Sequence, residues 1–169
     1  MDNNTYLIDY NLSFKDTIAK MIANFFGFHA SLIEGENELN EEDYIEAADT
    51  LTDWLKDYFK IISVNGENVG FVRMALRGGT VVWLEDIYVM PEYRKRGIAT
   101  RAIKLSEAFA QEVLKAPALC IDVVPRNIEA LKLYYKEGYD NISIITLRKE
   151  FGANKRNIKE KFLGFDFNI

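Results

Sequence analysis

The stretch "VMPEYRKRGIATRAI", residues 89–103, runs from an expected strand through a proline into the expected first turns of a helix. Basic residues crowd around its single glycine, Gly97; they are Arg94, Lys95, Arg96, Arg101 and, just beyond the stretch, Lys104. A helix N-terminus presents unpaired N–H groups and a partial positive charge, which together favour an anion such as phosphate. The stretch therefore predicts either a phosphate site, where Gly97 lets the ligand approach the backbone, or a solvated basic helix start.

The composition favours one compact domain over residues 1–169. Hydrophobic residues make up 49% of the chain, which is enough for a full core, and the net charge of -5 argues against general nucleic-acid binding. The single cysteine, Cys120, excludes intramolecular disulfides and cysteine-rich zinc sites, and we expect no metal. The chain starts without a secretory signal and lacks a long apolar run, so we expect a cytoplasmic protein without a membrane span.

Hydrophobic periodicity predicts alternating strands and helices. Four helices are expected, over 13–26, 41–59, 97–115 and 127–138. Ser13 is expected to cap the first of them, and residues 27–40 are expected to form a loop or a broken helix. Strands are expected over 5–10, in a hairpin over 60–76 that turns at Asn65-Gly66, and over 80–90, 118–124, 141–151 and 159–169. The apolar runs at 80–90 and 118–124 suggest strands that are buried on both faces. This order predicts an α/β domain with a mixed sheet.

Two motifs make the chain recognisable. "LEDIYVMPEYRKRGIATRAI" resembles the acetyl-CoA-binding motif of the GNAT N-acetyltransferases, whose Arg/Gln-x-x-Gly-x-Gly/Ala core is matched by Arg94, Gly97 and Ala99. The preceding V-x-P-x-Y-R run is matched by Val89, Pro91, Tyr93 and Arg94. Downstream, "NIEALKLYYKEGY" is similar to N-x-x-A-x-x-x-Y-x-x-x-G-F through Asn127, Ala130, Tyr134 and Gly138, with Tyr139 in place of phenylalanine. The resemblance implies a GNAT-like domain, with six to seven strands in a central mixed sheet and about four flanking helices.

The resemblance also implies how acetyl-CoA binds as the cosubstrate. The pyrophosphate would lie on the backbone N–H groups of a cradle made by Lys95, Arg96, Gly97, Ile98, Ala99 and Thr100, with Arg94 beside it. The pantetheine arm would run like an extra strand beside Ile87, Tyr88 and Val89. Asn127 and Tyr134 would face that arm from the downstream helix.

Acetyl transfer to an amine requires a base, a stabilised thioester oxygen and an acid for the leaving thiolate. His29 stands far from both motifs in sequence, and we expect a packed or surface residue. Cys120 lies in an apolar stretch, where a buried inert thiol is expected. Both expectations favour direct attack by the amine over an acyl-enzyme.

Tyr134 is the candidate acid. Helical spacing puts Asn127, Ala130 and Tyr134 on one face, while Tyr135 points roughly 100° away. The resemblance gives Tyr134 the role of general acid to the sulfur. The alternative is that both tyrosines are core aromatics, which suits Tyr135 better.

Glu85 and Asp86 are the candidate bases. Strand alternation sends them to opposite faces, so at most one points into the acceptor site. "LED" before "IYV" resembles the polyamine-type acetyltransferases, which favours Glu85; a structural role for Glu85, a role for Asp86 and transfer to water alone stay open. The backbone N–H near Val89 is the expected oxyanion donor, if the strand carries a bulge there.

Acidic residues are concentrated between Met21 and Leu55, a span without lysine or arginine. They are Glu34, Glu36, Glu38, Glu41, Glu42, Asp43, Glu46, Asp49 and Asp53. The span is either a solvated surface or a negative rim that attracts a cationic substrate. Because the family builds its acceptor wall from the first two helices, we expect a small cationic amine such as a polyamine or an aminoglycoside. The alternatives are a protein N-terminal or lysine acetyltransferase and a non-catalytic acyl-CoA sensor; the family often forms homodimers, which is possible here too.

Overall fold

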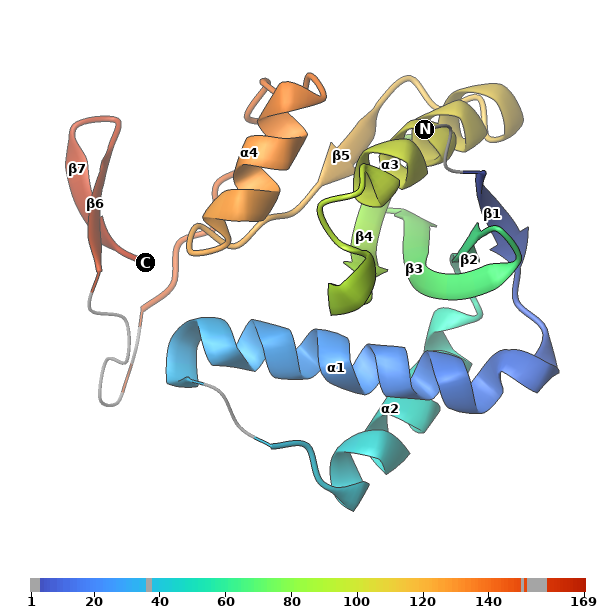
Figure 1. Ribbon diagram of the computed structural model, residues 1–169. Coiled ribbons are helices and arrows are strands. Elements are labelled where there is room, and N and C mark those ends of the chain that lie inside the picture. Colours follow the sequence, from blue (N-terminus) through green and yellow to red (C-terminus); the bar gives the residue numbers. More distant parts are fainter. Residues whose placement is uncertain (1–3, 36–37, 150, 152–157) are drawn as a thin grey trace. The chain divides into compact units, whose positions relative to one another are not determined.

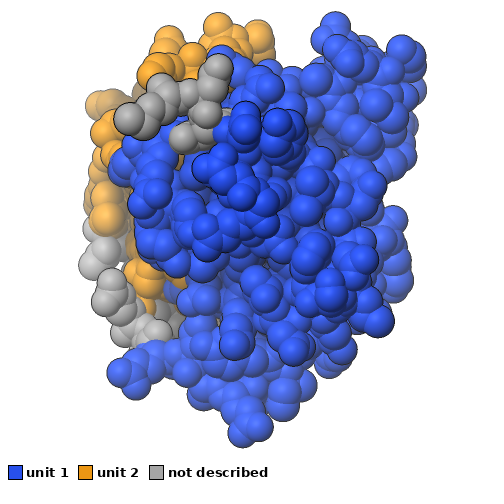
Figure 2. All heavy atoms as spheres, turned by 45° about the vertical axis from the view of Figure 1, so that its right-hand side comes forward, with its two compact units in different colours: residues 1–27, 38–122 blue, residues 28–37, 123–169 orange. Residues whose placement is uncertain are grey.

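The computed structural model describes residues 4–35, 38–149, 151 and 158–169, without the side chain of Glu34. Its contacts divide the chain into two compact units (Figure 2). Unit 1 comprises Met1–Gly27 and Glu38–Asp122, and unit 2 comprises Phe28–Asn37 and Val123–Ile169; each is described by itself. Among the described residues, no helix combines the length and the apolar character needed to cross a membrane.

Unit 1 is built on a five-stranded sheet with the order β1-β2-β3-β4-β5 (Figure 1). Its strands are β1 (Thr5–Asp9), β2 (Tyr58–Val64), β3 (Glu67–Leu76), β4 (Val82–Val89) and β5 (Leu119–Ile121). The first four pair antiparallel in sequence, and β5 pairs parallel to β4. The mixed sheet is confirmed, but the expectation of six to seven strands in it is wrong.

The β2–β3 hairpin forms where the sequence predicts it. Asn65 and Gly66 both have positive φ, at 52° and 85°, as the two central residues of a type I′ turn require. This turn matches the twist of the strands and fixes their register, which runs from the Val64–Glu67 pair to the Tyr58–Met74 pair.

The first two helices differ from the prediction at their ends. Asn11 rather than Ser13 caps the 3-10 turn η1 (Leu12–Phe14), because its side chain accepts from the Ser13 N–H. Helix α1 (Lys15–Glu34) then continues through residues expected as a loop or broken helix. Helix α2 (Glu41–Trp54) starts in a capping box between Asn40 and Asp43 and stops before 59, because Tyr58 already belongs to β2.

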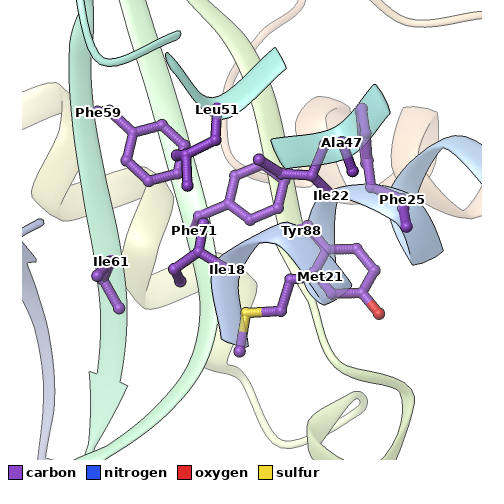
Figure 3. Packing of buried hydrophobic residues seen from close by; sticks show 11 residues of the cluster. Ile18, Met21, Ile22, Phe25, Ala47, Leu51, Phe59, Ile61, Phe71 and Tyr88 are labelled. Carbon is purple, nitrogen blue, oxygen red and sulfur yellow. The ribbon is translucent and has the colours of Figure 1, made fainter. Parts of the chain in front are cut away.

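A cluster of buried hydrophobic residues joins α1 and α2 to one face of the sheet (Figure 3). The Phe71 ring on β3 stacks between Phe59 and Tyr88, with centroids 5.5 and 5.7 Å away. Lys60, which points to the opposite face from Phe59, lies over the Phe109 ring, at the end of helix α3 (Ile98–Ala108). Figure 1 accordingly shows α2 and α3 on opposite sides of the sheet.

The helix expected over 97–115 changes its geometry part-way. After α3 the chain makes a π-helical turn, Phe109–Val113, closed by the Leu114 N–H on the Phe109 carbonyl. The wider turn shifts the phase of the apolar stripe, so Ala110 is buried while Val113 is exposed. Strand β5 is half-buried, so the prediction of a fully buried strand there is wrong.

Unit 2 contains the end of α1, helix α4 (Ile128–Lys136) and a separate hairpin of β6 (Lys159–Phe162) and β7 (Phe165–Asn168). Gly138 has φ 95°, as expected of the glycine that ends α4. The strand expected over 141–151 is not found in 141–149, and residue 150 lies outside the described residues. The strand expected over 159–169 is a hairpin instead, because Leu163 and Gly164 have positive φ and turn the chain.

Candidate active site

One edge of β4 is left open within unit 1. Strand β5 pairs with β4 only over Val82–Leu84, whereas β4 continues to Val89. The Met90 N–H donates to the Val69 carbonyl at 2.9 Å, and antiparallel pairing alternates along a strand. In the β3–β4 register, Ile87 and Val89 therefore direct their N–H and C=O groups away from β3, toward the edge beyond β5. Tyr88, between them, bonds toward β3 and buries its side chain in the core.

Among the described residues, no side chain caps the start of α3. Its N-cap, Gly97, has the left-handed conformation with φ 76° and ψ 4°. The first bond within the helix runs from the Arg101 N–H to the Gly97 carbonyl, at 3.0 Å, so the N–H groups of residues 98–100 have no acceptor in the helix itself. A Cβ added to Gly97 would meet nothing within 4 Å. The conformation, rather than crowding by the protein, therefore requires glycine here, and the backbone is open to an incoming group.

The arginines before Gly97 are held by the protein. Arg94 donates from Nε to the Val89 carbonyl at 2.8 Å, and its guanidinium lies 5.7 Å from the centre of the Tyr88 ring. Arg96 donates to the Glu92 carbonyl at 2.6 Å and lies over Tyr93, which belongs to the 3-10 turn η2 (Pro91–Tyr93). Arg94 thus links the open edge of β4 to the loop that begins α3.

The two tyrosines of this region stay neutral phenols near pH 7. Burial raises the pKa of Tyr88 above its ordinary value. A hydrogen bond to Glu67 raises the pKa of Tyr93 in the same direction. Neither side chain therefore supplies a base.

A bulge at Glu85 changes the faces of the two candidate bases. Met74 pairs with Leu84 but Arg73 pairs with Asp86, which leaves Glu85 as the extra residue. The Arg73 guanidinium contacts both carboxylates, Asp86 Oδ2 from Nε at 2.6 Å and Glu85 Oε2 from Nη2 at 3.9 Å. The expected opposite faces are therefore wrong. The β3–β4 pairing bulges at Glu85 and is regular at Val89, so the bulge on which the oxyanion role of Val89 was made conditional is not found there.

Glu85 belongs to a chain of ion pairs. Its Oε1 accepts from Arg77 Nε at 2.7 Å and its Oε2 accepts from Arg77 Nη2, while Arg77 Nη1 reaches Asp122 at 2.8 Å. Arg73 extends the chain to Asp57 at 2.7 Å. Glu85 therefore has a structural role as part of these ion pairs, which is one of the alternatives that the sequence left open.

The ion pairs also act on the two guanidinium groups. Hydrogen bonding to Glu85 raises the pKa of Arg77 above its ordinary value, although burial opposes this. Burial likewise tends to lower the pKa of Arg73, but the ion pairs with Asp86 and Asp57 outweigh it. Sequence reasoning missed both arginines, although Arg73 within β3 stands opposite "ED" on β4, with Arg77 just after the strand, and such opposite charges are a cross-strand signal.

In unit 2, α4 separates its two tyrosines. Tyr134 is buried and meets the Tyr139 ring edge-on at 6.3 Å, whereas the Tyr135 side chain is exposed. The prediction that they lie on different faces is confirmed, but the suggestion that Tyr135 is the better core aromatic is wrong. Asn127 caps α4, because its Oδ1 accepts from the Ala130 N–H at 3.2 Å.

Residues 28–139 match the family model for the acetyltransferase (GNAT) family, which is more than half of the chain. This protein belongs to the GNAT acetyltransferase family.

Two curated relatives illustrate the range of similarity. The GNAT chain is 29% identical over 105 residues to the N-alpha-acetyltransferase of Sulfurisphaera tokodaii, covering 54% of this chain and 63% of that protein. It is 23% identical over 143 residues to the spermine/spermidine N(1)-acetyltransferase of Bacillus subtilis, covering 78% of this chain and 91% of that protein. The chain therefore spans less than two thirds of the first relative and most of the second.

Solved structures establish the GNAT fold. The aminoglycoside N-acetyltransferase AAC(6′)-Iy in complex with CoA superimposes with a TM-score of 0.61 at 16% identity, covering 90% of this chain and 98% of that one. The PaiA N-acetyltransferase of Thermoplasma acidophilum in complex with coenzyme A gives a TM-score of 0.64 at 15% identity, covering 80% and 89%. At such identities the likeness concerns the fold alone.

The GNAT motif residues fall in both units. Unit 1 brings the edge at Ile87 and Val89 next to Arg94 and the α3 start at Gly97. Asn127 and Tyr134 belong to unit 2, and their catalytic and cofactor roles stay predictions. His29 also lies in unit 2, where its ring packs edge-on against Phe28 at 5.7 Å.

Proposed function

We propose that this protein is an acetyl-CoA-dependent N-acetyltransferase that transfers an acetyl group to a small cationic amine, with residues 1–169 acting as one domain. One observation carries the proposal. The open edge of β4 leads, through Arg94 on the Val89 carbonyl, directly to the uncapped start of α3 at Gly97. An extended edge next to a phosphate-ready helix start fits a long ligand with amides at one end and phosphates at the other.

The chain's residues fit coenzyme A at both ends. The N–H groups of Ile98, Ala99 and Thr100 would bind the pyrophosphate, because a Cβ placed on Gly97 meets no atom of the described residues within 4 Å. Exposed Lys95 and Arg96 would add positive charge there. At the other end, the backbone groups of Ile87 and the carbonyl of Val89 would bind the pantetheine amides as a neighbouring strand does. Bound acetyl-CoA supplies the acetyl thioester.

Three groups of this chain would serve the reaction. Glu85 would take the proton of the amine, directly or through water, and the Val89 N–H, which faces the open edge, would stabilise the thioester oxygen. Tyr134 would protonate the departing sulfur. We infer direct attack by the amine, since Cys120 lies half-buried within β5.

The charge on the ion-pair chain supports a cationic acceptor. Four carboxylates, those of Asp57, Glu85, Asp86 and Asp122, pair with the two guanidiniums of Arg73 and Arg77, so these six side chains together carry a formal charge of 2 − 4 = −2. An ammonium group gains from such a field. The name of the Bacillus subtilis relative and the aminoglycoside enzyme among the solved structures favour a polyamine or an aminoglycoside.

An acceptor screen tests the proposal. Purified protein would receive acetyl-CoA with spermidine, an aminoglycoside, free amino acids or short peptides with free N-termini, and the release of CoA thiol would be followed. We expect thiol release with the polyamine or the aminoglycoside. The Sulfurisphaera relative makes a protein N-terminus the rival acceptor, and peptides as the best substrates would establish it. Acetyl-CoA binding without thiol release for any amine would instead identify a non-catalytic sensor.

A further inference from the structure

Arg73 and Arg77 bind neighbouring carboxylates but are held differently. Arg73 lies within β3, its side chain is 19% exposed, and its guanidinium lies 4.7 Å from the centre of the Trp54 ring. Arg77 follows the last residue of β3, and its side chain is 45% exposed. The backbone of Arg73 is therefore fixed by the pairing of β3 with its neighbouring strands, whereas the backbone of Arg77 is connected to the sheet only through the residue before it.

The backbone after Arg77 is built to turn. Gly78 and Gly79 follow it, with φ of 63° and 146°, and a Cβ added to either would meet nothing within 4 Å. Two consecutive glycines in open space accept large φ/ψ changes at low cost. The guanidinium of Arg77 can therefore leave its carboxylates without disturbing the sheet.

Arg77 occupies both oxygens of the proposed base. Glu85 accepts from Nε and from Nη2 of Arg77, and Nη1 binds Asp122, while the guanidinium lies 4.2 Å from the centre of the Trp83 ring. A carboxylate that accepts a guanidinium fork with both oxygens is poorly placed to take a proton from an amine. For Glu85 to act as a base, Arg77 has to move aside.

We propose that Arg77 is a specificity-determining residue that competes with the cationic acceptor for Glu85 and Asp122, so that the amine binds by displacing the guanidinium. This inference rests on the proposed function. An alkylammonium carries the same unit charge as a guanidinium, so the exchange leaves the charge around the carboxylates unchanged. A neutral acceptor in place of the guanidinium would leave Glu85, whose side chain is only 10% exposed, with Arg73 at 3.9 Å as its remaining counter-charge, which is a weaker pair than the fork of Arg77. Arg77 thus favours cations over neutral amines.

The test uses Arg77→Gln with spermidine as the probe. Without the competing guanidinium, the KM for spermidine should fall by about three- to tenfold, as for the loss of one competing ion pair. The KM for acetyl-CoA should stay within about twofold of that of the unchanged protein, whereas a merely structural role would change both KM values together. Calorimetry of spermidine binding without acetyl-CoA should show the same gain in affinity.

Two further variants act as controls. Lys60→Gln removes the same charge from a pair with Asp9 elsewhere on the sheet, so it reports the general field effect. Arg77→Lys keeps the charge but loses the fork, so it should give an intermediate gain, and it decides the matter if Arg77→Gln does not fold. An unchanged or raised KM, or an equal gain in Lys60→Gln, would overturn the inference.

A double variant identifies the target of the competition. Adding Glu85→Gln to Arg77→Gln should abolish the gain in spermidine affinity, and a gain that survives would overturn the inference. If the unchanged protein acetylates no amine, the proposed function fails, while the calorimetric comparison still reports whether Arg77 competes with a polyamine. The two failures are therefore distinguishable.

Discussion

Helices α3 and α4 each begin within one of the two family motifs, but their first turns are built in opposite ways. At α3 the N-cap is Gly97, which offers no side chain, and the first-turn N–H groups have no acceptor in the helix. At α4 the Asn127 side chain satisfies the Ala130 N–H from within the chain. The first helix start thus keeps its N–H groups without a side-chain cap, and the second is closed by its own residue.

The difference teaches where each helix would contribute to the reaction. An uncapped start works through its backbone, so α3 should be sensitive to any side chain placed at its N-cap. Because Asn127 already caps the first turn of α4, the contribution of this helix should come from a side chain further along it, and the buried Tyr134 is the candidate. The predictions below test this division between backbone and side chain.

The largest effect is expected from Gly97→Glu, which puts bulk and negative charge where we propose the pyrophosphate binds. The affinity for acetyl-CoA, measured by calorimetry, should fall by about two orders of magnitude or more. Gly66→Glu is the matched control, since Gly66 also has positive φ and open space around it but lies in the β2–β3 turn. Both variants should lose a similar 1–2 kcal/mol or so of folding stability, and only the first should lose acetyl-CoA. Equal affinities in the two variants would refute the cradle.

A second large effect is expected from the side chain of α4. Tyr134→Phe should lower kcat by about one to three orders of magnitude with little change in acetyl-CoA affinity, because only a proton donor is lost. Tyr135→Phe, on the exposed face, should be nearly silent in steady-state kinetics. Swapped results would show that the wrong face of α4 was assigned to the chemistry.

Local patterns predicted most of the fold. The Asn65-Gly66 turn, the β4 apolar run and the Gly138 stop formed as expected, since each depends on neighbouring residues alone. The sequence did not predict the full length of α1, because no local pattern as clear as a capping residue indicates that the helix continues past Gly27. The stretch 141–149 has the composition of a strand, but a strand also needs a pairing partner, which a sequence pattern cannot supply.

The sequence predicted the backbone features of the candidate site but not its ion pairs. Arg94, Gly97 and the β4 edge follow from a contiguous motif. The pairing of Glu85 with Arg77 depends on a bulge that shifts the register by one residue, which the alternation rule does not foresee.

A smaller effect is expected from Asn127, where the cap and the proposed cofactor contact use different atoms. Asn127→Asp keeps the capping oxygen but loses the amide donor, so it should lower acetyl-CoA affinity a few-fold and leave stability nearly unchanged. Asn127→Ala should in addition cost about 1 kcal/mol of folding stability, measured by denaturant unfolding. If Asn127→Asp bound acetyl-CoA as tightly as the unchanged protein, Asn127 would be a helix cap alone.

The smallest effect is expected at the start of α2, which like α4 is capped by its own residues. Asp43 closes its capping box, so the informative change is Glu41→Gln with Glu42→Gln, which neutralises the first turn and keeps the cap. The KM for a polyamine should rise about twofold at low salt, and the difference should vanish at high salt because the field is screened. An unchanged KM at low salt would return the acidic span to the reading of a solvated surface.

The central claim is that the uncapped start of α3 and the open edge of β4 bind acetyl-CoA through their backbone. Amide chemical shifts of 15N-labelled protein, followed during an acetyl-CoA titration, test it most directly. We predict that the largest shifts occur at the N–H groups of Ile98, Ala99 and Thr100 and at those of Ile87 and Val89, with smaller shifts at Ala130, whose N–H is already bonded to Asn127. Saturable binding with unchanged amides at Ile98, Ala99 and Thr100 would contradict the account.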